Sequence, residues 1–520
     1  MPSHDVLVIG GGHNGLVCAT RLAQSDRRVL VLERSDRTGG CLRTDEIATG
    51  FRCPTLAHTV SIDPTVADTL GLERHGFERL HPGAHVSTPL GGGRALVLWR
   101  DEARARESIR GVSHHDADAY SGFLSSFSRI SGVLRSVLAA PPPSIDTPGV
   151  ADLIGALTTG RRFRALGRAD ARRLLRWLPM PVADLVGDEF ESAPLQATIA
   201  AGGVFGSFLG PRSAGSAAAL LVLGAVDGHP VSGGGFARGA AGAVADALTA
   251  AARAAGVDIR TGADVARIDV EESGATGVTL ATGETLTART IVSNADPKRT
   301  FSLVDPMFLD PEFVRRITNL RSRGALAKVN YAVSSLPSFE GASAEALSGR
   351  IRLAHDLDSI ERAFDCAKYG AWSPAPWIEL TIPSLLDPSL APAGAHVVSA
   401  CVQYAPYELR GTRWDAERDS LGDAVTRAID AQSPGFASSV VARQVITPLD
   451  LERDYGLTGG HIFHAELALD QLFVARPLLG WARYRTPIAN LYLCGAGTHP
   501  GAGATGMSGM LAANAILKSE

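Results

Sequence analysis

The order of apolar and polar positions near the start of the chain predicts a strand, a helix and a second strand. Residues 5–9 form a short apolar run, residues 13–23 follow a helical pattern rich in alanine and leucine, and residues 29–32 form another apolar run. The first run leads into a glycine-rich turn at residues 10–15, and Glu33 follows the second run. Strand, tight turn and helix in this order are typical of a nucleotide-binding α/β unit.

The rest of the chain alternates between helical and strand patterns. Residues 79–100 predict a β-hairpin that turns at the glycines 91–93, and residues 114–229 predict mostly helices. Further strands are predicted at residues 257–260, 265–268, 278–280, 286–291, 325–333, 377–382, 396–402 and 490–494. Helices are predicted at residues 243–254, at residues 415–432 and at the end of the chain through residue 516. The four strands between residues 257 and 291 are expected to form one small sheet.

A chain of 520 residues exceeds one typical hydrophobic core, so two domains are expected. The predicted fold class is α/β, with a Rossmann-type dinucleotide-binding domain and a discontinuous substrate domain of mixed α+β structure. Residues 1–78, 230–305 and 455–520 are assigned to the dinucleotide-binding domain. Residues 79–229 and 306–454 are assigned to the substrate or cap domain.

Composition and charge narrow this picture mainly by exclusion. A hydrophobic content of 45% with 20% charged residues is typical of a globular enzyme, and a net charge of −4 predicts no nucleic-acid partner. The six cysteines contain no C-x-x-C pair and no metal-ligand spacing, so neither a disulfide framework nor a metal site is expected. The first strand begins at Asp5, which leaves no room for a signal peptide, and the longest apolar run, residues 217–226, is too short to span a bilayer. A cytoplasmic protein is therefore expected.

One basic segment is also compatible with contact at a membrane surface. Seven arginines between residues 161 and 177 alternate with Phe163, Leu166, Leu174, Leu175 and Trp177. A basic amphipathic helix can lie on an anionic membrane, so peripheral membrane contact through residues 161–177 is one interpretation. A solvent-exposed helix face on the substrate domain explains the same pattern, and we favour it.

The turn at residues 10–15 has the glycine spacing of a dinucleotide-binding fingerprint. Gly10 permits the tight turn, Gly12 lets the backbone approach a pyrophosphate, and Gly15 lets the helix pack close to the strand. The start of the helix offers free N–H groups and a positive dipole end to the phosphates. Glu33 would accept hydrogen bonds from the adenosine ribose hydroxyls. The motif alone does not separate FAD from NAD.

Two further glycine-rich segments favour FAD. Gly39 and Gly40 follow the fingerprint at a distance that brings the backbone close to the diphosphate, and Arg43 can neutralise charge there. Residues 495–509 combine glycines and small residues at a strand–helix junction, where backbone N–H groups can reach a ring edge or a phosphate. Val265 is expected to meet adenine through its backbone.

With both ends of the chain considered, the sequence resembles flavoproteins of the phytoene desaturase and carotenoid isomerase superfamily, which is related to the amine oxidases. The motifs that carry this resemblance are residues 8–15, 39–40, 293–296 and 491–501. More narrowly, the chain is similar to the branch called pyridine nucleotide-disulfide oxidoreductase domain-containing protein 2, through residues 328–331, 387–392, 462–464, 469–471 and 475–477. The branch name does not describe this sequence, which has no redox-active cysteine pair.

The resemblance implies that the chain binds FAD noncovalently. The positions that it implies for cofactor binding are Gly10, Gly12, Gly15, Glu33, Arg34, Gly39, Gly40, Arg43, Val265, Asn294, Gly495, Gly497, Thr505, Gly506 and Met507. The isoalloxazine would lie between the two domains, with the turn at residues 495–509 beside its pyrimidine edge. The reaction would be hydride transfer from a substrate C–H to flavin N5.

Lys328 is the candidate catalytic residue. Its predicted strand resembles the strand of amine oxidases that carries a lysine ordering a water at flavin N5. The alternative is a structural lysine paired with a carboxylate. His58, His464 and His499 are weaker candidates for lining the substrate site, and each is more readily explained as a structural histidine.

The leading interpretation is an FAD-dependent oxidoreductase that acts on an apolar small molecule of isoprenoid or acyl type. The alternatives are a carotenoid desaturase, isomerase or ketolase, an amine oxidase, and a flavin-binding regulatory protein with little turnover. Amine oxidases usually present an aromatic cage, and a chain with 6% aromatic residues indicates none. No feature of the sequence indicates an oligomeric state.

Overall fold

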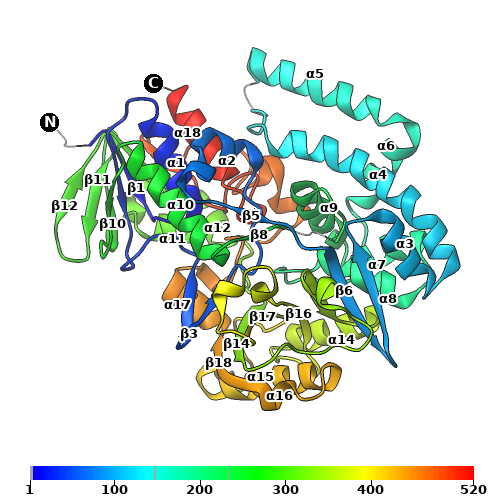
Figure 1. Cartoon of the computed structure of the whole chain (residues 1–520). Helices are drawn as coiled ribbons and strands as arrows, with labels where there is room; N and C mark the ends of the chain where they lie inside the picture. The colour runs from blue at the N-terminus through cyan, green and yellow to red at the C-terminus, as the bar shows by residue number, and fades with distance from the viewer. Residues whose placement is uncertain (1–3, 146–147, 232–233, 520) are drawn as a thin grey trace.

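A parallel five-stranded sheet carries the glycine-rich turn of the N-terminus. The computed structural model describes residues 4–145, 148–231 and 234–519. The sheet has the strand order β19-β13-β1-β2-β9, and every pairing in it is parallel. Figure 1 shows its strand β1 on the side of the molecule where the N-terminus lies. Its strands are β1 (Val6–Ile9), β2 (Val29–Leu32), β9 (Asp258–Arg260), β13 (Thr290–Ser293) and β19 (Leu491–Leu493). The two ends of the chain both lie on this side of the molecule.

The side chains of β1 alternate between two hydrophobic cores, one on each face of the sheet. Val6 and Val8 pack with helices α1 (His13–Ala23), α10 (Ala240–Ala254) and α18 (Met507–Leu517). Leu7 and Ile9 pack against a three-stranded antiparallel sheet and two short helices. These elements are β10 (Val265–Glu271), β11 (Gly274–Leu280), β12 (Thr285–Thr287), α11 (Pro297–Ser302) and α12 (Pro311–Thr318).

The prediction of one small sheet between residues 257 and 291 is wrong. β9 and β13 join the parallel sheet, and only β10, β11 and β12 pair with one another in a separate sheet. All four residues of β13 are buried, as a central parallel strand requires, whereas β10 exposes several residues to solvent. The break between β12 and β13 divides residues 286–291, which the apolar pattern predicts as one strand.

A mixed seven-stranded sheet has the order β18-β14-β17-β16-β15-β6-β7. All of its pairings are antiparallel except that of β15 with β6. Its strands are β6 (Ala84–Gly91), β7 (Arg94–Trp99), β14 (Leu326–Val333), β15 (Arg350–Leu353), β16 (Trp377–Thr381), β17 (His396–Gln403) and β18 (Val440–Ile446). The β6–β7 hairpin confirms the hairpin predicted for residues 79–100.

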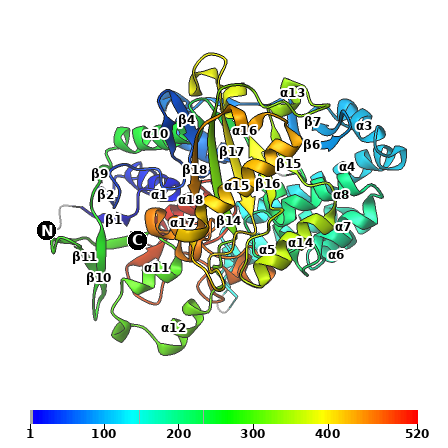
Figure 2. The same ribbon diagram turned by 90° about the horizontal axis from the view of Figure 1, so that it is seen from below.

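The two faces of this sheet differ in character. Ala327, Val329 and Tyr331 of β14 pack against α15 (Trp414–Gln432), which lies across one face (Figure 2). The alternate residues Lys328 and Asn330 therefore face the opposite side, where Nδ2 of Asn330 donates a hydrogen bond to the carbonyl oxygen of Thr55. A polar row on the inner face of a sheet is unusual, because buried polar groups need partners.

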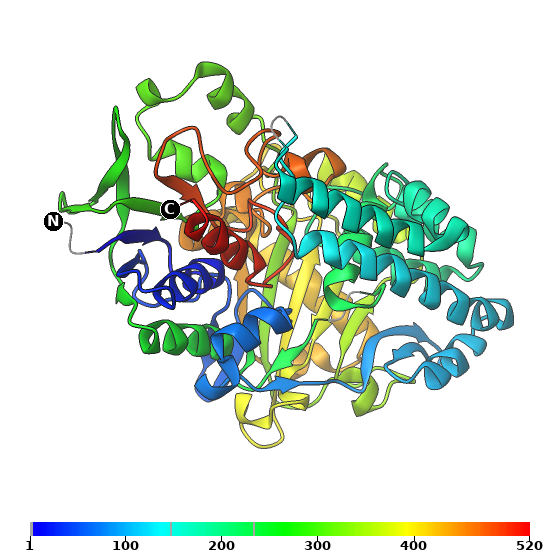
Figure 3. The ribbon, with the colours of Figure 1, turned by 90° about the horizontal axis from the view of Figure 1, so that it is seen from above.

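Helices occupy most of residues 102–227, as the sequence pattern predicts, and lie beyond the β6–β7 side of the large sheet (Figure 3). They are α3 (Glu102–Arg110), α4 (His114–Leu138), α5 (Val150–Ala165), α6 (Gly167–Trp177), α7 (Val182–Glu189), α8 (Ala193–Ala200) and α9 (Ser216–Asp227). Within the described parts of the chain, no helix is both long and apolar enough to cross a membrane.

The remaining helices and strands lie in the connections within and between the two sheets. They are β3 (Thr44–Ala48), β4 (Phe51–Pro54), α2 (Pro64–Leu70), β5 (Arg79–Leu80), β8 (Phe236–Ala237), α13 (Ala344–Leu347), α14 (Leu357–Lys368), α16 (Phe436–Ser439) and α17 (Pro448–Tyr455). The strands of the parallel sheet come from the segments assigned to the dinucleotide-binding domain, and those of the seven-stranded sheet come from the other two segments. The exact boundaries of the two domains stay a prediction.

Candidate active site

A groove opens at the carboxyl ends of β1 and β2, which we call the nucleotide groove. At its floor, the Glu33 carboxylate accepts hydrogen bonds from the backbone N–H groups of Gly11 and Ser35, both at 2.8 Å. These bonds fix the acid beside the glycine turn. The groove is lined by residues that include Gly10, Gly12, His13, Glu33, Arg34, Gly40, Arg43, Asp264, Val265, Asn294, Tyr455, His464 and Ala496.

The glycines of the turn are required by close packing. A Cβ atom on Gly15 would lie 2.2 Å from the carbonyl oxygen of Gly10, and one on Gly12 would lie 2.8 Å from Nδ2 of Asn294. Gly10 itself has a φ of +94°, which L-residues with side chains rarely adopt. The turn therefore keeps its backbone bare and close to the groove, which is the geometry that a pyrophosphate needs.

Three side chains of the groove hold buried polar atoms that have no partner within the described residues. They are Nε2 of His13, Nε of Arg43 and Nδ1 of His464. Burial, reinforced by the nearby His464, lowers the pKa of His13 to about 4, so its ring is neutral at physiological pH. Unpaired buried donors and acceptors indicate a polar ligand, and a groove with an arginine, a ribose-binding acid and a bare glycine turn fits the polar half of FAD.

The predicted cofactor-binding positions separate into two groups. The positions that line the nucleotide groove are Gly10, Gly12, Glu33, Arg34, Gly40, Arg43, Val265 and Asn294. The positions that pack beneath the surface of the groove are Gly15, Gly39, Gly495, Gly497, Thr505, Gly506 and Met507. Sequence reasoning missed His13, Asp264, Tyr455 and Ala496, of which only His13 lies inside the N-terminal fingerprint.

The C-terminal turn acts through its packing. A Cβ on Gly495 would lie 2.5 Å from the carbonyl oxygen of Asn294, and one on Gly509 would lie 2.1 Å from that of Asn14. These contacts join the end of the chain to its first helix. The small residues between them, Ala496, Ala502, Gly503 and Ala504, line the cavity described next.

A second cavity, which we call the inner cavity, continues from the nucleotide groove. The two share His13, Cys41, His464 and Ala496. One part of the inner cavity is apolar and is lined by Leu56, Ala57, Phe205, Leu223, Val226, Leu326, Ala327, Leu451, Ile462 and Phe463. The other part is polar and is lined by His58, Thr59, Ser61, Asp227, Lys328, Arg350, Glu379 and Cys401. A flat cofactor in the groove would thus face a pocket that is apolar on one side and charged on the other.

The charged part is a row of side chains across four neighbouring strands. Lys328 of β14 is directly opposite Cys401 of β17, and Cys401 is directly opposite Glu379 of β16. Glu379 is in turn directly opposite Arg352 of β15. Nζ of Lys328 donates a hydrogen bond to Sγ of Cys401 at 3.6 Å, and Nε of Arg352 donates to Glu379 at 2.7 Å.

Glu379 is the electrostatic centre of this row. Its side chain is fully buried and contacts Arg352, Arg350 at 3.5 Å and Nε2 of His58 at 3.3 Å. Burial would raise the pKa of the Glu379 carboxyl, but Arg350, Arg352 and the bond from His58 outweigh it and hold the pKa well below its ordinary value. Burial lowers the pKa of Arg352 to about 10, which leaves it charged. Glu379 is therefore a carboxylate that compensates two buried arginines.

The three candidate histidines occupy different environments. His58 lines the inner cavity, and His464 lies where the cavity meets the nucleotide groove. Burial lowers the pKa of His464 to about 4. His499 lies outside both spaces, with Nε2 at 3.3 Å from the carbonyl oxygen of Val137, and burial lowers its pKa to about 4 as well.

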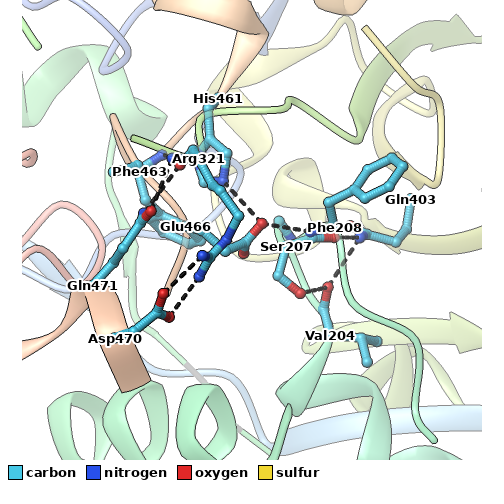
Figure 4. A network of polar contacts seen from close by, with 12 residues as sticks. Val204, Ser207, Phe208, Arg321, Gln403, His461, Phe463, Glu466, Asp470 and Gln471 are labelled. Carbon is cyan, nitrogen blue, oxygen red and sulfur yellow. Dashed lines mark hydrogen bonds and ion pairs between the residues drawn. The ribbon is translucent and has the colours of Figure 1, made fainter. Parts of the chain in front are cut away.

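A polar network anchors the apolar wall of the inner cavity (Figure 4). The amide of Gln403 donates hydrogen bonds to the carbonyl oxygens of Val204 and Ser207, at 2.9 and 2.7 Å. Glu466 accepts a bond from the backbone N–H of Phe208 at 3.0 Å. The two Gln403 bonds connect the segment that carries Phe205 to the end of β17, and the Glu466 bond connects the same segment to the loop that carries Glu466. The wall is therefore held in place although it contains little regular structure.

One group of acidic and histidine residues with metal-ligand spacing lies away from this site. His115, Asp116 and Glu191 have ligand atoms within 4.8 Å of one another. The Asp116 oxygens accept hydrogen bonds from the backbone N–H groups of Glu191 and Ser192, at 2.8 and 2.9 Å. The carboxylate thus anchors the start of α8, and this contact explains its burial.

Comparison with known proteins decides the family. The description "Flavin containing amine oxidoreductase" matches residues 15–402, which is most of the chain. The chain belongs to this family. It is accordingly an FAD-dependent oxidoreductase, and the bare glycine turn and the acid of the nucleotide groove fit that cofactor.

Individual relatives agree with this assignment. The chain is 36% identical to the rat (Rattus norvegicus) pyridine nucleotide-disulfide oxidoreductase domain-containing protein 2, over 99% of this chain and 94% of that protein. It is 25% identical to a limonene dehydrogenase polypeptide of Castellaniella defragrans, over 99% and 94%, and 24% identical to a phytoene desaturase of Fusarium fujikuroi, over 96% and 86%. The superfamily and the branch inferred from the motifs are thus confirmed.

A solved structure supports the fold. An oxidoreductase from Methanosarcina mazei superposes with a TM-score of 0.63 at 15% identity, over 99% of this chain and 100% of that one. The predicted fold class, a Rossmann-type FAD-binding domain with a substrate domain, is confirmed.

Proposed function

We propose that this flavoenzyme oxidises an apolar small molecule by removing a hydride from one of its C–H bonds. The observation that carries the proposal is the inner cavity, which has a largely apolar lining and shares the wall of His13, Cys41, His464 and Ala496 with the nucleotide groove. Binding sites for small molecules are typically concave and mostly apolar, with a few placed polar groups. The bound flavin supplies the hydride acceptor. The name of one relative, a limonene dehydrogenase, is consistent with an apolar substrate.

The chain's own residues would position substrate and cofactor against each other. Glu33 and the bare turn at Gly12 would hold the nucleotide half, so that the ring meets the shared wall of His464 and Ala496. Phe205 lines the apolar part of the inner cavity and would pack against the substrate, which would keep the substrate next to that wall. Holding two reacting atoms in contact distance and excluding water supplies much of the rate enhancement in such reactions.

An amine substrate fits the cavity less well. Its lining includes the carboxylates of Glu379 and Asp227, but Glu379 already compensates Arg350 and Arg352, and Lys328 and Arg350 would repel a cationic ammonium group. Among the described lining residues, the large aromatic side chains are Phe205 and Phe463, which form no tyrosine or tryptophan cage. These features favour a neutral or anionic substrate over an amine.

The test of this proposal is anaerobic mixing of the purified holoenzyme with three classes of compound. They are isoprenoid hydrocarbons, oxygenated isoprenoid or acyl compounds, and primary amines. We expect an apolar compound to bleach the visible absorbance of the bound flavin. Reduction by the amines alone would contradict the proposal, and a flavin that no compound reduces would favour a regulatory role.

Lys328 is proposed to assist the reaction of the reduced enzyme with oxygen. It is 1% exposed, lines the inner cavity and would place a positive charge near the ring. We expect Lys328→Met to slow reoxidation by oxygen roughly 100-fold while FAD stays bound, because a buried charge that stabilises a developing anion is worth about that much. Stopped-flow reoxidation measures the rate. Lys368→Met, which removes an exposed lysine paired with Asp365, is the control, and an unchanged rate in Lys328→Met would reject the role.

We also propose, in place of the solvent-exposed interpretation that the sequence alone favours, that α5 contacts an anionic membrane surface, because the structure adds an exposed apolar face to the basic residues of this helix. Val150, Leu153, Ile154 and Leu157 share one face of α5 and are 57–74% exposed. Arg161, Arg162 and Arg164 follow on the same helix and are exposed. α5 lies at the edge of the molecule, with α4 and α6 beside it (Figure 1).

Vesicle sedimentation tests this surface. Replacing the arginines at 161, 162 and 164 by glutamine should weaken binding to anionic vesicles by roughly 100-fold, because each basic residue near such a surface contributes about 1 kcal/mol. Neutral vesicles are the control, since they offer the apolar contact without the charge. Equal sedimentation of wild type and variant with anionic vesicles would leave the solvent-exposed interpretation of residues 161–177.

A further inference from the structure

Cys401 occupies the centre of the polar row and has two titratable neighbours. It is 2% exposed and lines the inner cavity. Its Sγ lies 3.4 Å from Nδ1 of His58 and 3.6 Å from Nζ of Lys328. The other ring nitrogen of His58 lies 3.3 Å from Oε1 of Glu379. A thiol, an imidazole and a carboxylate thus stand in sequence, with the thiol at the cavity wall.

This order of groups is the one that activates a nucleophile or base. The imidazole can hold the thiol proton, and the carboxylate fixes the orientation of the imidazole. His58 and Glu379 come from distant segments, and Glu379 reaches Cys401 only because β16 and β17 are paired in register. An arrangement of three groups that meets at a cavity has a chemical use more often than a packing one.

The electrostatics favour the anionic form of Cys401. Burial raises the pKa of its thiol, but the charges of His58 and Lys328 outweigh burial, so the pKa lies below its ordinary value despite the opposing carboxylate of Glu379. Burial also lowers the pKa of His58, and its contacts with Cys401 and Glu379 reverse this and raise it. Both directions favour transfer of the thiol proton of Cys401 to the imidazole of His58, and Lys328 also lowers the pKa of that thiol.

The other cysteines near the site behave differently. Burial raises the pKa of Cys41, which lines both the groove and the inner cavity, to about 11. Burial raises the pKa of Cys53, on β4, to about 12 although Lys328 is nearby. Burial alone raises the pKa of a thiol in this part of the protein. The lowered pKa of Cys401 is therefore due to its neighbours His58 and Lys328.

Arg350 adds a second observation at the same wall. It lines the inner cavity, is 5% exposed, and its Nε has no hydrogen-bond partner in the described part of the chain. Its remaining nitrogens contact Glu379 and the carbonyl oxygen of Val231. A buried N–H group beside a cavity needs a hydrogen-bond acceptor, and Nε of Arg350 has none in the described protein. This favours a substrate that carries an oxygen atom.

We propose that Cys401 is the acid–base residue of the reaction and that the substrate is an oxygenated apolar molecule. The inference rests on the proposed function. A thiolate is too weak a base for an unactivated hydrocarbon. The proton that Cys401 removes therefore comes from a hydroxyl on the reacting carbon, or from a carbon next to a carbonyl group. Arg350 would hold that oxygen.

The step balances in atoms and electrons. One substrate C–H bond breaks and its hydrogen leaves with both electrons, which reduce the bound FAD. The neighbouring O–H or C–H bond breaks and its proton forms an S–H bond with Cys401, while the electron pair left behind forms the new C=O or C=C bond. The substrate is oxidised by two electrons, and Cys401 ends the step as a neutral thiol, with His58 still protonated beside it.

Alkylation of the holoenzyme with iodoacetamide, mapped by mass spectrometry, tests the state of the thiol without any turnover. We expect Cys401 to react at least about 100-fold faster than Cys41 at neutral pH, because only a thiolate is nucleophilic. Its rate should be nearly flat from about pH 7 to 9, and His58→Gln should make that rate rise with pH. A Cys401 rate that already climbs through this range in wild type would overturn the proposal.

The role in the reaction is tested with Cys401→Ser and, as a control, Cys366→Ser on the surface helix α14. With a compound that reduces the wild-type flavin, Cys401→Ser should slow flavin reduction by at least about 100-fold. The substitution should also remove the pH dependence of the rate of flavin reduction. Wild type already alkylated at Cys401 should show the same loss, which covers the case of a misfolded serine variant. Equal rates of flavin reduction in wild type and Cys401→Ser overturn this inference alone. Failure of every compound to reduce the wild-type flavin overturns the proposed function and this inference with it.

Discussion

Gly12→Val is expected to give a folded protein that contains no FAD. The added Cβ lies 2.8 Å from Nδ2 of Asn294, and the two methyl groups beyond it enter the groove where the pyrophosphate would lie. We expect the dissociation constant for FAD to rise by up to about 100-fold, because overpacking of this kind costs up to about 3 kcal/mol. The visible spectrum of the purified protein and a titration of the apoprotein with FAD measure the loss.

Gly187→Ala is the matched control for this substitution. Gly187 lies in α7, has no atom within 4 Å of its added Cβ and has an ordinary φ. Alanine there should leave the FAD content unchanged, because it improves helix propensity and touches nothing. A yellow Gly12→Val protein with wild-type affinity would contradict the placement of the cofactor in the nucleotide groove.

Glu379→Gln is expected to produce the largest loss of stability of any conservative change in the site. It leaves Arg350 and Arg352 buried without their carboxylate. Removing one partner of a buried ion pair lowers the free energy of unfolding by about 3–5 kcal/mol. Denaturant unfolding of the holoenzyme measures the difference. Glu345→Gln breaks an ion pair with Arg104 in which both side chains are about half exposed, and it should change stability little.

The pH dependence of stability gives an independent check of Glu379. Its pKa in the folded state lies below the value of about 4.3 in the unfolded chain. The carboxylate therefore stabilises the protein fully above that value, and the contribution is lost as the pH falls below it. As the pH falls below about 4, wild type should lose the part of its stability that Glu379→Gln lacks at every pH, so the stabilities of the two proteins should converge. Curves that stay parallel down to low pH would show that Glu379 is not the compensating group.

The nucleotide half of the site could be predicted because its signal is local. Gly10, Gly12 and Gly15 lie within one turn, and Glu33 follows the next strand, so their spacing in the sequence already encodes their spacing in space. For the C-terminal turn, the motif predicts cofactor contacts through Gly495 and Thr505. In the structure those residues pack inward, and their neighbours Ala496 and Gly503 line the cavities. A glycine-rich pattern does not tell which of its members face a ligand.

The chemical half of the site could not be predicted because it depends on strand register. Lys328, Cys401, Glu379 and Arg352 come from four strands, and a shift of one residue in any pairing would turn one of them to the other face. Lys328 alone stands out in the sequence, as a lysine in an apolar strand. Cys401 and Glu379 lie in strands whose apolar pattern gives no hint of a partner. His58 joins them from a loop, where no periodicity applies.

The proposed reaction removes hydrogen from an apolar molecule bound beside FAD. The most direct measurement is an anaerobic single turnover with an oxygenated apolar compound, in which flavin absorbance and product mass are followed together. The account predicts bleaching of one flavin for each product formed, and a product two hydrogens lighter than the substrate. A product of unchanged mass with an unbleached flavin would indicate isomerisation and would contradict it.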